Sequence, residues 1–322
     1  MRRDLATSGE LLHGDLAIAR HGDLAIARRG RRGRMSVEAS ATGFVDGTGG
    51  VRLFYQCWLP EGCKTRAAMV ITHGGAEHSG RYQNVVDYFV PQGYAVWGLD
   101  NRGHGRSEGR RGHVDRYEQL VDDLALFCDF VRQRTPGEAR LFLLGHSIGG
   151  LTALSYAVKY GAPGSCPVDG LIVSGPCLAL SMKVSKLKEA LGRAAARLFP
   201  KMTVDAGIPA EAISRDPAIV AAYVSDPLRY PRITLRFYVE LAKQMARTMA
   251  AAPFVQLPCL ILQGGKDAIV SPYAARRFYS AMTCRDREMR IYPDSFHELF
   301  NDVNREEVLA DVADWLARHG AA

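Results

Sequence analysis

Short apolar runs rich in β-branched residues recur along this chain and alternate with stretches of helical periodicity. Most of the runs are apolar at every position, which is typical of strands buried on both faces of a parallel sheet. Strands that alternate with helices predict an α/β fold class, with a mostly parallel central sheet and helices on both faces. The predicted strands span residues 51–59, 67–72, 94–99, 140–144, 170–173, 258–263 and 288–292, and the predicted helices span 114–134, 148–160, 233–249 and about 308–316.

The alternation is interrupted between about residues 178 and 252, where no convincing strand pattern is found. A stretch of this length is too long for a loop and predicts an inserted helical subdomain. It leaves after one predicted strand and returns before the next, so it should lie over the carboxyl ends of the sheet, where open α/β sheets bind ligands. We therefore predict a core formed by residues 35–177 and 253–322, with a helical cap or lid at 178–252.

Residues 1–34 differ from the rest of the chain. The octamer HGDLAIAR stands at 13–20 and again at 21–28, and an Arg/Gly tract follows. We expect a disordered leader, or a mis-assigned start with Met35 as the true initiator. This segment carries +4 of the net charge of +7, so the remaining 288 residues carry only +3. The charge therefore does not favour a nucleic-acid partner.

The seven cysteines are scattered and never form a C-x-x-C pair. Neither a disulfide framework nor a zinc site is indicated, and reduced thiols in a cytoplasmic protein are the simplest interpretation. No apolar run approaches the ~18 residues of a membrane span. We expect no metal and no cofactor.

The sequence Gly-His-Ser-Ile-Gly at 145–149 matches the pattern G-x-S-x-G. It lies between a predicted strand and a predicted helix, which is the context of a nucleophile elbow. Such a turn holds its serine in a strained conformation, so its neighbours must be small, and the start of the helix favours negative charge. We therefore predict Ser147 to be a catalytic nucleophile.

A serine hydroxyl needs a general base, and in this type of site the acid and then the histidine follow the serine in the chain. Only His297 and His319 follow Ser147. His319 lies in the last four residues, where chain ends fray, whereas His297 follows the predicted strand 288–292 in a turn-rich loop. We predict His297 to be the base.

The acid that orients this histidine should follow the preceding strand. Asp267 lies four residues after the predicted strand 258–263. Asp294 is the competitor, but it lies on the same loop as His297, three residues away, and its side chain would need an awkward return to reach Nδ1. We favour Asp267, whose role would be to fix the imidazole tautomer and stabilise the imidazolium.

Two N–H donors are needed for the oxyanion that forms on attack. The amide after the nucleophile, that of Ile148, is one donor. The second should come from the loop after an early strand, and residues 73–75, His-Gly-Gly, follow the predicted strand 67–72.

Three strings are more informative together than the serine motif alone. Residues 73–82 read HGGAEHSGRY, residues 100–109 read DNRGHGRSEG, and residues 145–150 read GHSIGG. They resemble monoacylglycerol lipases and related lysophospholipases of the α/β-hydrolase superfamily, within the serine aminopeptidase S33-like group. SRDP at 214–217 and YVSDP at 223–227 look like the cap of that family. The resemblance covers roughly residues 40–318.

The resemblance implies an α/β-hydrolase fold and further site residues. Gly75 and Ile148 would be the oxyanion donors; the family often has Ala at the position of Gly75, and glycine keeps the N–H but loosens the backbone. Glu77, Arg81 and Tyr223 match residues around the polar pocket for the leaving glycerol. The alternative for Glu77 and Arg81 is a structural salt bridge that supports the oxyanion loop.

The expected activity is that of a serine esterase working through an acyl-enzyme, with a lipid ester as the small-molecule substrate and monoacylglycerol as the first choice. Alternatives are a lysophospholipase, a general carboxylesterase, an acyltransferase, an S33-type peptidase and a non-catalytic binding protein of the same fold.

The first part of the predicted cap combines an apolar stripe with interleaved basic residues. The stripe is Leu180, Val184, Leu187, Leu191 and Leu198, and the basic residues are Lys183, Lys186, Lys188, Arg193 and Arg197. Such a helix either lies on an anionic membrane surface, giving peripheral association, or is a plain cap helix with its apolar side toward an acyl channel. A second apolar face, at 233–249, would complete a tunnel for a fatty chain. The oligomeric state cannot be predicted.

Overall fold

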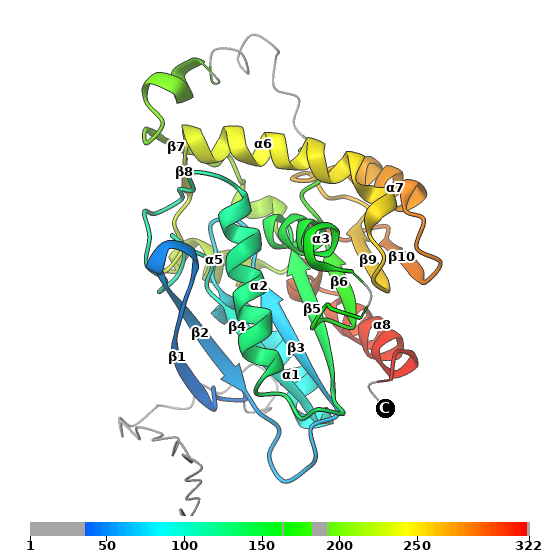
Figure 1. The fold of residues 1–322 in the computed structure, drawn as a ribbon. Coiled ribbons are helices and arrows are strands. Elements are labelled where there is room, and N and C mark those ends of the chain that lie inside the picture. Colours follow the sequence, from blue (N-terminus) through cyan, green and yellow to red (C-terminus); the bar gives the residue numbers. More distant parts are fainter. Residues whose placement is uncertain (1–35, 163, 182–191, 193, 321–322) are drawn as a thin grey trace, which may run out of the picture. The chain divides into compact units, whose positions relative to one another are not determined.

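The computed structural model describes residues 36–162, 164–181, 192 and 194–320, and the part from Val37 onward forms one compact unit. Within it, eight strands form one sheet in the order β1-β2-β4-β3-β5-β6-β9-β10 (Figure 1). The strands are β1 Ala41–Asp46, β2 Arg52–Trp58, β3 Ala67–Thr72, β4 Tyr94–Leu99, β5 Arg140–His146, β6 Gly170–Ser174, β9 Cys259–Gly264 and β10 Arg287–Tyr292. The predicted α/β class is confirmed, and each predicted strand lies within two residues of its observed bounds.

The sheet is parallel from β4 to β10, and the hairpin of β1 and β2 closes one edge in antiparallel fashion. The edge strand β1 is missing from the predictions. Its residues are exposed or half-buried and only two of them, Phe44 and Val45, are large and apolar, so it lacks the continuous apolar run of a central strand.

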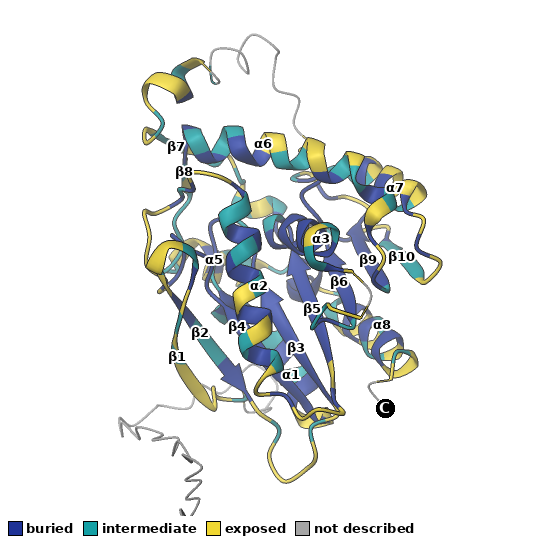
Figure 2. Ribbon diagram, in the orientation of Figure 1, coloured by how far each residue is buried: buried dark blue, intermediate teal, exposed yellow. Residues whose placement is uncertain are grey.

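Successive side chains of each strand point to opposite faces and so build two hydrophobic cores. In β3, Ala68 and Val70 join the core under α2 and α3, whereas Met69 and Ile71 join the core under α1 and α8. Figure 2 shows the central strands buried along their whole length between these layers. The helices are α1 Gln83–Phe89, α2 Glu118–Arg132, α3 Ile148–Tyr160, α5 Pro217–Ser225, α6 Leu235–Ala250, α7 Pro272–Ala281 and α8 Arg305–Arg318.

The expectation that residues 178–252 contain no strand is wrong. Strand β7 (Thr203–Asp205) pairs with strand β8 (Arg232–Thr234) in a small antiparallel ribbon. Three-residue strands are too short to show a period of two in the sequence, which is why the pattern missed them. The boundaries of the cap stay a prediction. The leader also stays a prediction, since residues 1–35 lie outside the described residues.

The second predicted cap helix corresponds to α6, and it packs on α3. Phe237 and Leu241 belong to the core beneath it, and the Thr248 hydroxyl hydrogen-bonds Ser155 of α3 at 2.9 Å. The buried face of α6 is thus occupied by the core. The amphipathic stripe through Val184, Leu187 and Leu191 falls outside the described residues. In the described part of the chain, no helix has the length and apolar character needed to cross a membrane.

Candidate active site

Ser147 lies at the sharp turn between β5 and α3, with φ 54° and ψ −117°. A non-glycine residue with positive φ is strained, so the surroundings must hold it in place. They do so by close packing: a Cβ at Gly149 would lie 2.1 Å from the Thr72 carbonyl oxygen, and one at Gly145 would lie 2.5 Å from the Gly149 carbonyl. The strand–turn–helix context predicted from the sequence is therefore present, with glycine required at both positions.

His297 and Asp267 form a buried pair, with 2.7 Å between His297 Nδ1 and Asp267 Oδ2. The other carboxylate oxygen of Asp267 accepts the N–H groups of Ile269 and Val270, each at 2.9 Å. These bonds fix the carboxylate, so Nδ1 of the imidazole donates its hydrogen bond to Asp267. Nε2 is then left for proton transfer. His297 and Ser147 line the same cavity, which lies at the carboxyl ends of the strands.

The two side chains shift one another's pKa. Burial by itself would lower the pKa of His297, but the Asp267 carboxylate outweighs it and the pKa is raised above 6.5. Burial would raise the pKa of Asp267, and the charge of His297 together with the two amides lowers it below its usual value. Both shifts favour an ionised aspartate that supports an imidazolium.

Asp294 and His319, the other candidates for the acid and the base, form ion pairs with other residues and not with His297 or Asp267. The Asp294 side chain is 71% exposed and pairs with Lys266 at 2.8 Å. His319 stacks on Trp315, with ring centroids 4.0 Å apart, and pairs with Asp286. Of the residues weighed from the sequence, the structure thus brings together Ser147, His297 and Asp267.

The loop after β3 lies directly against the serine turn. A Cβ at Gly75 would lie 2.8 Å from the Ile148 side chain, and one at Gly74 would lie 3.2 Å from Ser147 Cβ. Ile148 begins α3, so its N–H has no acceptor within the helix. Among the described residues, Ala76 and Ser147 are the non-glycine residues with positive φ, and both flank this point. Backbone strain gathered at one place is typical of a functional site.

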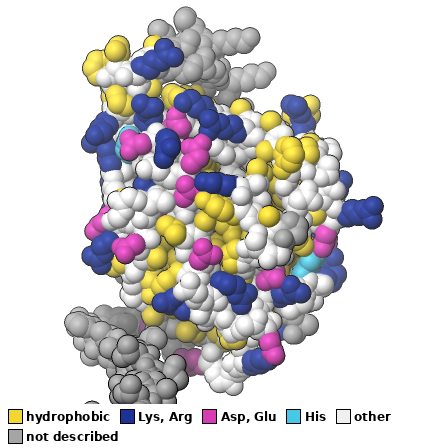
Figure 3. Space-filling view, in the orientation of Figure 1, with side chains coloured by type: hydrophobic (Ala, Val, Ile, Leu, Met, Phe, Trp, Pro, Cys, Tyr) yellow, Lys and Arg dark blue, Asp and Glu magenta, His cyan; other side chains and the backbone are white. Residues whose placement is uncertain are grey.

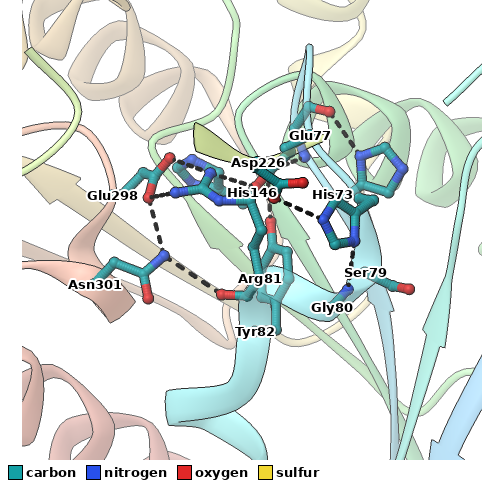
Figure 4. Close-up of polar contacts among 12 residues, drawn as sticks. His73, Glu77, Ser79, Gly80, Arg81, Tyr82, His146, Asp226, Glu298 and Asn301 are labelled. Atoms are coloured by element: carbon teal, nitrogen blue, oxygen red, sulfur yellow. Dashed lines mark hydrogen bonds and ion pairs between the residues drawn. The ribbon is translucent and has the colours of Figure 1, made fainter. Parts of the chain in front are cut away.

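Glu77 and Arg81 belong to a buried ion-pair cluster behind this loop (Figure 4). Arg81 Nη1 contacts Glu77 at 2.9 Å, and its two terminal nitrogens bind the carboxylate of Glu298 at 2.6 and 2.8 Å. The other oxygen of Glu77 accepts the Gly74 N–H at 2.5 Å and the Tyr82 hydroxyl at 2.9 Å. Glu77 and Arg81 thus form a salt bridge, as the alternative interpretation of these two residues expected, and Glu77 also holds the loop after β3 through the Gly74 N–H.

Tyr223 of α5 reaches the cluster from within the segment predicted to be a cap. Its ring lies 4.6 Å from the Arg81 guanidinium and 4.0 Å from that of Arg229. Glu77, Glu298 and Tyr223 line the cavity that also contains Ser147. The wall of this cavity therefore combines polar groups with the apolar residues Ile208 and Ile213.

Residues 213–215 are also tied to the loop that contains His297. The Glu298 N–H donates to the Ile213 carbonyl at 2.8 Å, and the Ser214 hydroxyl donates to the Asn301 carbonyl at 2.9 Å. Arg215 pairs with the fully buried Asp302 at 2.9 Å. The string SRDP at 214–217 therefore fastens the segment before α5 to the loop after His297.

Known proteins resemble both the sequence and the fold. The family model described as serine aminopeptidase, S33, matches residues 63–304. The chain belongs to this family. A monoacylglycerol lipase of Mycolicibacterium smegmatis is 34% identical over 85% of the chain and 95% of that protein, and the phospholipase YtpA of Bacillus subtilis is 29% identical over 78% and 95%.

The fold of this chain is also similar to solved structures of lipases. The monoacylglycerol lipase of Paleococcus ferrophilus superposes with a TM-score of 0.73 at 30% identity, covering 83% of this chain and 99% of that one. A monoglyceride lipase of Saccharomyces cerevisiae superposes with a TM-score of 0.79 at 24% identity, covering 88% and 96%. This S33-family protein is a carboxylic ester hydrolase with the α/β-hydrolase fold.

Two residues near the site of this family member are missing from the sequence predictions. Glu298 follows the histidine directly, but its partner Arg81 is 217 residues away and no local pattern marks the pair. The His146 ring lies 4.6 Å from that of His297, and burial lowers its pKa to about 3, which keeps it neutral. No group of metal-ligating side chains is found within the described residues.

Proposed function

We propose that this hydrolase cleaves monoacylglycerols into fatty acid and glycerol through Ser147, His297 and Asp267. The observation that carries the proposal is the buried 2.7 Å pair of His297 and Asp267, which lines one cavity with the strained Ser147. The named activity of the relatives in Mycolicibacterium and Paleococcus supports monoacylglycerol as the substrate.

In the first half-reaction, Ser147 Oγ attacks the ester carbonyl carbon while His297 Nε2 takes the hydroxyl proton. The carbonyl oxygen becomes an oxyanion held by the N–H groups of Gly75 and Ile148. When the carbon–oxygen bond to the alcohol breaks, the imidazolium returns its proton to the departing oxygen. Glycerol leaves, and the acyl group stays on Ser147.

In the second half-reaction, a water molecule takes the place of the alcohol. His297 removes its proton, the hydroxide attacks the acyl carbon, and the same two amides hold the second oxyanion. The bond to Ser147 then breaks, Oγ regains the proton from His297, and the fatty acid is released. Asp267 keeps its charge throughout and stabilises the imidazolium.

The polar lining supports a small polyol as the leaving group. Glu77, Glu298 and Tyr223 line the same cavity as the histidine that must protonate the leaving oxygen. The carboxylates are already engaged by Arg81, so their contribution is to shape and polarise the cavity rather than to offer a free charge.

A lysophospholipase activity is the second candidate, favoured by the similarity to the phospholipase of Bacillus subtilis. A substrate panel separates the two: monooleoylglycerol, lysophosphatidylcholine and p-nitrophenyl esters of several chain lengths. We expect the highest kcat/KM for the monoacylglycerol. A higher value for the lysophospholipid would favour the second candidate.

The catalytic assignment is tested with a fluorophosphonate probe, which labels activated serines. We expect labelling of the wild-type enzyme and none of Ser147→Ala. Ser155→Ala is the matched control, because Ser155 is a buried serine of the same helix whose hydroxyl bonds the Leu151 carbonyl. Equal labelling of Ser147→Ala and wild type would refute the assignment.

We also propose a cytoplasmic enzyme that associates peripherally with anionic membranes through the cap. Leu198, Phe199 and Met202 are 75%, 61% and 49% exposed, and Lys201 lies among them. Figure 3 shows hydrophobic and basic side chains together at this end of the cap. Phe199→Ser should reduce co-sedimentation with phosphatidylglycerol vesicles, whereas Phe254→Ser, an exposed residue outside this cluster, should not. Equal binding by both variants would contradict the proposal.

A further inference from the structure

His73, the residue after β3, is fully buried and uses both of its ring nitrogens. The backbone N–H of Asn101 donates to Nε2 at 2.9 Å. A backbone N–H can only donate, so Nε2 carries the lone pair and the proton of the neutral ring is on Nδ1. Nδ1 in turn donates to the carbonyl of Gly74 at 2.7 Å. Burial lowers the pKa of His73, which keeps the ring in this neutral tautomer.

Gly74 is therefore held at both of its polar groups. Its N–H donates to Glu77 at 2.5 Å, and its carbonyl accepts from His73. The peptide between Gly74 and Gly75 is trans, so the Gly75 N–H points opposite to the Gly74 carbonyl and away from the His73 ring. Within the described residues this N–H has no acceptor.

A peptide between two glycines needs such a restraint. Neither residue has a Cβ to limit rotation, so the unit can turn more easily than in a chain with side chains. If it turned over, the Gly74 carbonyl would face the reacting oxygen in place of the Gly75 N–H. A donor would be lost and a repelling dipole gained. The bond from His73 Nδ1 opposes that rotation.

We propose that His73 is the positioning residue of the oxyanion hole, because its Nδ1–H holds the Gly74–Gly75 peptide with the Gly75 N–H turned toward the reacting carbonyl. The inference rests on the proposed role of Ser147. It adds a residue that touches neither substrate nor nucleophile but fixes a donor that does.

Two substitutions of His73 separate its two hydrogen bonds. In His73→Asn the amide nitrogen stands near the position of Nδ1 and can still donate to the Gly74 carbonyl. In His73→Gln the amide reaches the position of Nε2 and can still accept from Asn101, but no donor remains for Gly74. Each variant keeps one hydrogen bond of His73 and loses the other. Because both lose one bond, a difference in kcat between them cannot be attributed to a general loss of stability.

We expect His73→Gln to lower kcat by about 10²–10³-fold, the effect of losing one oxyanion donor, with KM little changed. His73→Asn should stay within tenfold of wild type. The affinity for an alkyl boronic acid, which mimics the tetrahedral intermediate, should fall in parallel with kcat. The melting temperatures of the two variants should be similar.

Two results would overturn the inference: a wild-type kcat in folded His73→Gln, or equal losses of kcat and boronate affinity in both variants, which would indicate a purely structural role. Failure of the underlying function is distinguishable. If Ser147→Ala kept its activity, the catalytic assignment itself would fall, whatever the His73 variants did.

Discussion

Replacing Arg81 by methionine tests whether the buried ion-pair cluster stabilises the site. The Arg81 side chain is 9% exposed and contacts two carboxylates, those of Glu77 and Glu298, which are 4% and 6% exposed. Methionine keeps much of the aliphatic stem and removes the charge. Removing one partner from a buried pair leaves an uncompensated charge, which is far more costly than the loss of a surface pair.

The magnitude follows from the pKa of Glu77. Burial alone would raise this pKa, but Arg81, together with the smaller influences of His146, His73 and the Gly74 N–H, outweighs burial and brings it from 4.5 down to about 2. A fall of that size corresponds to about 3 kcal/mol of folding free energy at neutral pH. Arg81 is the largest of the lowering influences, and removing one partner of a buried pair costs about 3–5 kcal/mol. We therefore expect Arg81→Met to lose about 3 kcal/mol, which corresponds to a melting temperature lower by roughly 6–12 °C.

The sign of the pH dependence is fixed by the same shift. The pKa of Glu77 is lower in the folded than in the unfolded state, so its stabilisation is present above pH 4.5 and is lost as the pH falls toward about 2. In Arg81→Met the unpaired carboxylate binds a proton more readily. Burial raises the pKa of that carboxylate, so the difference in stability between wild type and variant should begin to shrink above pH 4.5 and continue to shrink on further acidification.

The assay is urea unfolding followed by tryptophan fluorescence at pH 7, 5 and 4. Arg318→Met is the matched control, because Arg318 also binds one carboxylate, that of Glu288, through two nitrogens, but its side chain is 51% exposed. We expect a loss of under about 1 kcal/mol there. Equal losses in the two variants, or a loss in Arg81→Met that grows on acidification, would refute the reasoning.

Three further outcomes are expected. The acid limb of the kcat/KM profile should have its midpoint above pH 6.5, because the pKa of His297 is raised and only the neutral imidazole is a base; a midpoint below 6.5 would contradict this. Asp267→Asn should lower kcat about 10⁴-fold and Asp294→Asn should leave it near wild type, as steady-state assays of both would show. Gly149→Ala should unfold at a markedly lower temperature in calorimetry, since its Cβ would overlap the Thr72 carbonyl at 2.1 Å; an unchanged transition would mean that the turn can relax.

The sequence predicted those parts of the fold in which apolar residues form an uninterrupted run or a regular period within one segment. The strand before Ser147 and the helix after it each show their own apolar pattern. Asp267 and His297 could be chosen because each follows a predicted strand, in the chain order serine, aspartate, histidine. The cap ribbon of β7 and β8 was missed because three residues do not reveal a period.

The Arg81–Glu298 pair and the two bonds of His73 escaped prediction for another reason. Arg81 and Glu298 are 217 residues apart, and His73 meets Asn101 across 28 residues. Such contacts exist only once the folded sheet has brought together the segments that follow β3, β4 and β10. A single sequence contains no record of them beyond the polar character of the residues themselves.

The bonds that fasten residues 213–215 to the loop after His297 have a consequence for protein engineering. The predicted cap, residues 178–252, is a continuous piece of chain, yet the residues that anchor it come much later in the sequence, at Glu298, Asn301 and Asp302. A chimera that exchanged the cap only between its chain ends would pair a foreign anchor with the resident loop and disturb the histidine beside it. The transferable module is therefore discontinuous: the cap together with residues 297–302.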